Sequence, residues 1–74
     1  MGTIHRFPAS QSLDPADLEI AAAVYVDVVQ HLALPTGDEL SRERIAQSII
    51  ERMLLGERDP IRLHDAALAR LGLA

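Results

Sequence analysis

The side chains best suited to chemistry are the three histidines His5, His31 and His64. The chain has no cysteine, so these are its only neutral ligands for a transition metal. Two histidines on one helix can share an ion when they lie three or four residues apart, and none of the three has that spacing. His64 and Asp65 are adjacent, so on a helix they point in different directions. We therefore expect no metal site and no bound cofactor.

Carboxylates cluster where helices are expected to begin, and capping of helix N-termini explains that placement. A catalytic pair of carboxylates needs a pocket that shifts one pKa, and a chain of 74 residues has little volume for a cleft of about 300 Å³. No serine lies in a nucleophile motif, and no glycine-rich phosphate loop is present. We therefore predict that the protein is not an enzyme.

Length and composition indicate one small folded domain near the limit of independent stability. Hydrophobic residues make up 49% of the chain, which is typical of a globular protein and not of a disordered one. A domain this small usually needs a disulfide, a metal or a partner surface. Since no disulfide can form, a partner surface is the supplement we expect.

The pattern of helix starts and apolar spacing predicts an all-α, three-helix domain over residues 13–74. The helices are expected at about 14–34, 41–55 and 60–71, after an extended or disordered N-terminal arm over residues 1–12. Asp14 followed by Pro15, and Asp59 followed by Pro60, are typical of a helix N-cap and first turn. Ser41 is the expected cap of the second helix, with Thr36 and Glu39 as a rival capping box, and Gly56 is expected to end it.

The first helix is apolar around most of its circumference, which is typical of a helix buried on more than one side. One stripe contains Leu18, Ala21, Ala22, Tyr25, Val28, Val29 and Leu32. A second stripe supplies the predicted interface residues Ile20, Ala23, Val24, Val26 and Ala33. Two shorter helices cover only part of this surface, so we predict a homodimer through the first helix, with another protein as an alternative partner.

A DNA-binding helix-turn-helix, built from the second and third helices, is the alternative function. Arg58, Arg62 and Arg70 would then face the duplex, and a binding face should also collect Arg42 and Arg52. Against this, the third helix has no Asn, Gln, Lys or Ser to read base edges, and the net charge is −4. We expect no nucleic-acid partner and no membrane association, and a cytoplasmic protein.

Residues 45–71 resemble the C-terminal part of small bacterial helical proteins of unassigned function. The distinctive motif is Gly56-Glu57-Arg58-Asp59-Pro60 followed by Arg62-Leu63, and the resemblance extends over about the last 60 residues. The motif is a helix stop followed by a helix start. The resemblance therefore implies a fold and a bacterial cytoplasmic setting, and it carries over no catalytic residue.

Overall fold

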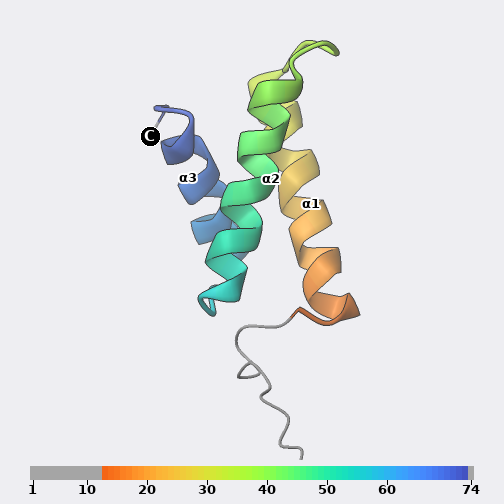
Figure 1. Ribbon diagram of the computed structural model, residues 1–74, viewed down its shortest axis with the longest axis vertical. Coiled ribbons are helices and arrows are strands. Elements are labelled where there is room, and N and C mark those ends of the chain that lie inside the picture. Colours follow the sequence, from red (N-terminus) through yellow and green to blue (C-terminus); the bar gives the residue numbers. More distant parts are fainter. Residues whose placement is uncertain (1–12, 74) are drawn as a thin grey trace, which may run out of the picture.

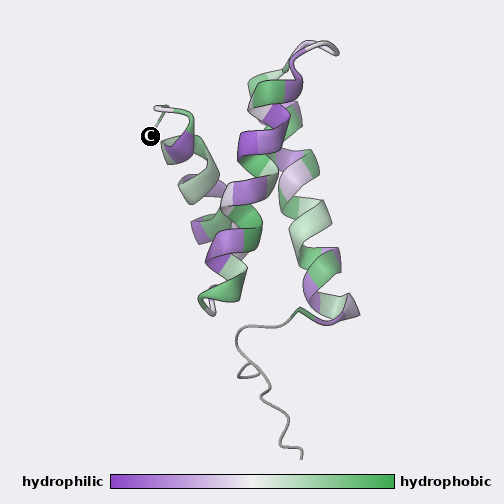
Figure 2. Cartoon of the chain, in the orientation of Figure 1, coloured by the Kyte–Doolittle hydropathy of each residue, from purple (hydrophilic) through white to green (hydrophobic). Residues whose placement is uncertain are grey.

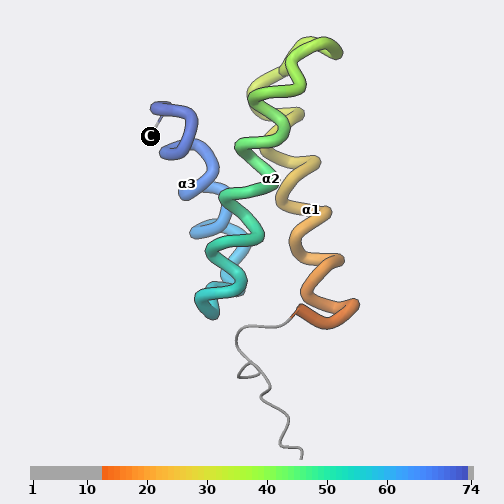
Figure 3. The backbone as a smooth tube through the Cα atoms, in the orientation of Figure 1, coloured from red at the N-terminus to blue at the C-terminus, as the bar shows by residue number. Residues whose placement is uncertain are grey.

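The computed structural model describes residues 13–73, which form three α-helices that pack side by side. They are α1 (Pro15–Leu32), α2 (Glu39–Leu54) and α3 (Pro60–Arg70). The chain runs up α1, down α2 and up again along α3 (Figures 1 and 3). This confirms the predicted all-α, three-helix architecture. The predicted arm at residues 1–12 lies outside the described residues.

Local capping chemistry sets the starts of the three helices. Asp14 accepts a hydrogen bond from the Asp17 amide at 2.9 Å, and the Asp14 amide donates back to the Asp17 carboxylate at 3.2 Å. Asp59 caps α3 by accepting from the Ile61 amide. The predicted cap of α2 was wrong: Asp38 accepts from the Ser41 amide, so the helix begins two residues earlier than expected.

The ends of α1 and α2 depend on residues with positive φ. Ala33 adopts a left-handed conformation with φ 50°, and its amide donates to the Gln30 carbonyl. Pro35 disfavours helical geometry at Leu34, so α1 ends at Leu32 and not at the predicted residue 34. Gly56 has φ 104° directly after α2, which only glycine adopts without strain. This confirms its predicted role as the helix stop.

One apolar core lies between the three helices, and every helix contributes to it. Val24 and Val28 from α1 meet Ile49 and Met53 from α2 and Leu63 from α3, each at most 2% exposed. The remaining buried apolar residues are Ala21, Ile45 and Ala67. Ile45, Ile49 and Met53 therefore form the inner side of α2, and Leu63 and Ala67 form that of α3.

Ser48 is the one polar residue buried among the apolar side chains of the described chain. Its exposed fraction is 2%. No buried side-chain nitrogen or oxygen among the described residues lacks a hydrogen-bond partner. A small polar side chain on the inner side of α2 is thus accommodated without an orphaned group.

Two arginines hold the connections between helices. The Arg42 guanidinium donates to the Pro35 carbonyl at 2.6 Å and to the Thr36 carbonyl at 3.2 Å, which ties the first connection to α2. The Arg58 guanidinium donates to the Met53 carbonyl at 2.6 Å, at the C-terminal end of α2. Arg42 therefore holds carbonyl groups of the connection before α2, and Arg58 adds a donor to a carbonyl in the last turn of α2.

Candidate interaction surface

The five predicted interface residues of α1 do not form one free surface. Val24 is 2% exposed and belongs to the core, so its assignment to an interface was wrong. Ile20 is half-buried and packs against the core. Ala23, Val26 and Ala33 are exposed. The predicted stripe is therefore divided between the core and the outer surface of the helix.

The reason lies in the angular positions of these residues on α1. At 3.6 residues per turn, the predicted stripe spans about 180° of the circumference, and it also contains Glu19, Asp27 and Gln30. Those three polar residues are all exposed. Most of the predicted stripe is consequently the ordinary solvated side of the helix.

The uncovered apolar surface of α1 is a different arc, which begins beside α2. It spans about 100° of the circumference and includes no charged residue. Leu18 is 51% exposed and Val26 is 47% exposed, while Ala22 is exposed and Tyr25 is half-buried. Half-buried Ala46 and Ile50 continue this surface on α2. We call the groove face the surface formed by Leu18, Ala22, Tyr25, Val26, Val29, Ala46 and Ile50.

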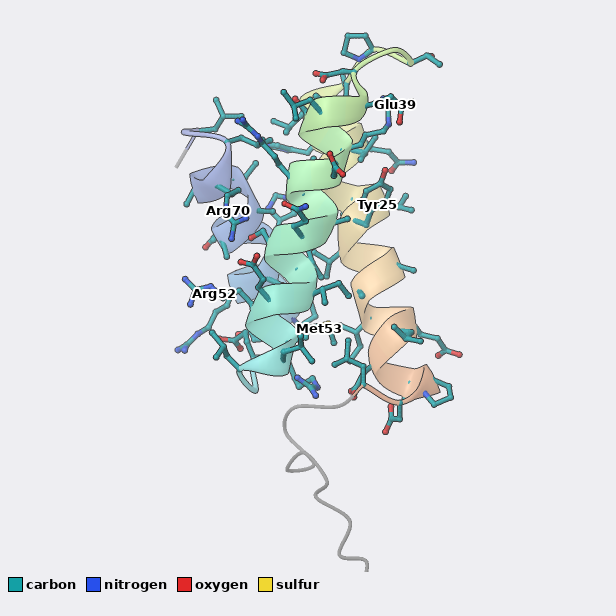
Figure 4. The ribbon with its side chains drawn as sticks, in the orientation of Figure 1. Tyr25, Glu39, Arg52, Met53 and Arg70 are labelled. Carbon is teal, nitrogen blue, oxygen red and sulfur yellow. The ribbon has the colours of Figure 1, made fainter. Side chains whose placement is uncertain are left out.

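The groove face contains a shallow hollow between α1 and α2. The hollow has a volume of about 180 Å³ and is lined by Ala21, Ala22, Tyr25, Ala46, Ile49 and Ile50. Beyond Tyr25, towards the connection between the helices, Glu39, Arg42 and Glu43 border a second hollow. Figure 4 shows Tyr25 on α1 beside α2, with Arg52 and Arg70 on the other side of α2.

The hydropathy colouring agrees with this division of the molecule. In Figure 2, hydrophobic colour runs along α1 where it adjoins α2, and hydrophilic colour recurs on the outer turns of α2. Leu18, Ala22, Tyr25 and Val29 belong to the first apolar stripe of the helix, whose spacing alone does not distinguish core from surface. The signal that distinguishes the two stripes is the absence of charged residues from the first one.

The arginines proposed for DNA binding are engaged with acidic side chains of the same chain. Arg58 pairs with Asp17 at 2.9 Å, and Arg70 pairs with Glu51 at 2.5 Å. Arg62 lies 3.9 Å from Glu57 and from Asp59. These contacts interleave acids with the arginines, so they offer no support for a phosphate-binding face.

The Asp17–Arg58 pair is the best-formed ion pair among the described residues. Two parallel hydrogen bonds join the guanidinium and the carboxylate, at 2.9 and 3.2 Å, and the Asp17 side chain is 17% exposed. The hydrogen bond from Arg58 and that from the Asp14 amide lower the pKa of Asp17 below its ordinary value. Hydrogen bonds from Ser41 likewise lower the pKa of Asp38.

Two of the three histidines meet, which the sequence did not predict. His31 near the end of α1 and His64 in α3 have ring centroids 5.4 Å apart, with an interplanar angle of 75°. Over residues 13–73, however, no group of three or more His, Asp or Glu side chains is placed to hold a metal ion. His5 lies outside the described residues.

Comparison with known proteins yields no relative: no family model, curated protein or solved structure matches the chain. None of the described helices is long and apolar enough to cross a membrane. What can be said of function therefore depends on the surfaces of the three-helix domain itself.

Proposed function

We propose that this protein is a small helical interaction protein that forms a homodimer through the groove face. The observation that supports the proposal is the uncharged arc of α1 left uncovered by α2 and α3, with Leu18 at 51% exposure in its first turns. Exposed apolar residues scattered singly are ordinary, but a contiguous patch marks an interaction site. The proposal keeps α1 as the dimerising helix and moves the interface to its α2 side.

A second copy suits this surface because the face contains both a projection and a hollow. Leu18 projects from α1, and the exposed Ala22 and half-buried Ala46 border the hollow about one turn away. A two-fold axis between the two features would bring Leu18 of each copy to the hollow of the other. The α1–α2 pairs of two copies would then form a four-helix arrangement with a shared apolar centre.

The two adjacent alanines on α1 provide a matched test of the interface. Ala22 lines the hollow, whereas Ala23 is exposed on the polar side of the same helix. We expect Ala22→Glu to convert the dimer to a monomer, because it places a charge at the apolar contact. Ala23→Glu should leave the dimer intact. Sedimentation equilibrium at several micromolar concentrations measures both, and circular dichroism confirms that both variants remain helical.

Three outcomes would contradict the proposal. A single 8.1 kDa species for the unmodified chain throughout the micromolar range would exclude the homodimer. Dissociation by Ala23→Glu but not by Ala22→Glu would return the interface to the originally predicted stripe. Dissociation by neither variant would place any dimer contact outside α1.

A further inference from the structure

We propose that His31 and His64 form a two-histidine site for a divalent transition-metal ion of the Ni²⁺, Cu²⁺ and Zn²⁺ class. The two residues lie 33 positions apart in the chain and come from different helices, and the packing of α1 beside α3 brings their rings together. Imidazole nitrogen is a preferred ligand of these ions. This site is separate from the groove face, which lies between α1 and α2.

The separation of the rings matches the distance that a shared ion requires. Two imidazoles bound to one tetrahedral ion, with each metal–nitrogen bond about 2.0–2.1 Å long, have ring centres about 5 Å apart. The centroids of His31 and His64 are 5.4 Å apart. The rings meet edge to face at 75°, so binding needs a rotation that directs one nitrogen of each ring to a common point. The χ2 torsion of histidine is broad, and such a rotation is inexpensive.

The surroundings of the pair are acidic, which favours a cation. His64 lines a cleft of about 220 Å³ together with Asp27 and Asp65, and no arginine is among its lining residues over the described chain. Asp27 precedes His31 by four residues, so the two lie on the same side of α1. Because His31 is exposed and His64 is only half-buried, water can occupy the remaining coordination positions.

A bound ion would join α1 to α3, so it should stabilise the folded chain. The site does not exist in the unfolded chain, and a ligand that binds only the folded state raises the folding equilibrium constant. At a free metal concentration 100 times the dissociation constant of the ion, the folding equilibrium constant rises about 100-fold. The ion should therefore raise the unfolding temperature progressively as its free concentration rises above the dissociation constant.

The test uses the full chain without an affinity tag, titrated with NiCl₂ by calorimetry and followed by thermal unfolding. We expect one ion to bind per chain and the unfolding temperature to rise with NiCl₂ but not with MgCl₂. His31→Gln and His64→Gln should each abolish both effects, while His5→Gln serves as the matched control and should retain them. A rise that persists in either of the first two variants, an equal rise with MgCl₂, or no binding by about 1 mM NiCl₂ would overturn the proposal.

Discussion

The two sides of α1 differ in the contacts that they make with the rest of the chain. The side facing α3 makes polar contacts as well as apolar ones: Asp17 near its start pairs with Arg58 in the connection before α3, and His31 near its end meets His64 in α3. The side facing α2 has an apolar contact that stays partly open, with exposed Ala22 and Leu18 at its border. The first side is therefore completed within one chain, whereas the second has apolar surface that a partner can still cover.

The largest expected effect comes from Val24, which lies between the two sides. Val24→Asp should unfold the domain, because it buries a charge with no partner, and such substitutions reach about 4 kcal/mol or more. Val26→Asp, two residues further along the same helix, should remain folded because Val26 is 47% exposed. The helical signal in circular dichroism distinguishes them; a folded Val24→Asp variant would contradict the assigned core.

The same comparison can be made by truncating one apolar residue of α3 and one apolar residue of the groove face. Leu63→Ala removes a fully buried side chain from α3 and should cost about 2–5 kcal/mol of unfolding free energy. Ile50→Ala on the groove face should cost less, because the side chain is only half-buried in one chain. Urea denaturation measures both values.

The dependence of these two free-energy costs on protein concentration tests whether a second copy covers the groove face. If a second copy covers the groove face, the free-energy cost of Ile50→Ala should grow as the protein concentration rises through the dissociation constant of the dimer. The cost of Leu63→Ala has a fixed intrachain part and should change less. Equal and constant costs for the two variants would remove the distinction between the completed and the open side.

Breaking the Asp17–Arg58 pair should have a smaller effect that depends on pH. Arg58→Met removes both hydrogen bonds to Asp17 and those to the Met53 and Glu57 carbonyls, so it should lower the urea midpoint without changing the slope. Because the pair lowers the pKa of Asp17 in the folded state, its contribution is present at neutral pH. It is lost as the pH falls from about 5 through that lowered pKa.

This pH dependence is measured as the difference in urea midpoint between the unmodified chain and Arg58→Met at each pH. The midpoints of the unmodified chain and of Arg58→Met should converge in acid, leaving only the effect of the lost carbonyl contacts. A difference that stays constant from pH 7 to about pH 2 would show that the ion pair contributes nothing beyond those contacts.

The smallest effect is expected at the exposed pair between α2 and α3. Arg70→Met removes the contact with Glu51, whose side chain is 59% exposed, and should cost about 0–1 kcal/mol. Urea denaturation in low salt and in about 1 M salt checks this value, since screening should remove what remains. A cost above that of Arg58→Met would show that exposure does not decide the strength of these pairs.

Local features of the sequence determined the helices themselves. Asp14 with Pro15 and Asp59 with Pro60 mark the two starts correctly, and Gly56 marks a stop, because capping involves only residues within one turn of each other. Where two local options competed, before α2, the prediction failed: Asp38 and not Ser41 is the cap. The apolar character of the first helix was likewise evident from its residues alone.

Only the tertiary structure decided which side of each helix faces inward. Val24 became core, Ala22 stayed exposed and Ser48 was buried because these outcomes depend on the directions from which α2 and α3 approach, which no local spacing encodes. The meeting of His31 and His64 has the same origin, since it requires α1 and α3 to lie side by side. Helix formation depends on neighbours in the chain, whereas interfaces and ligand sites depend on neighbours in space.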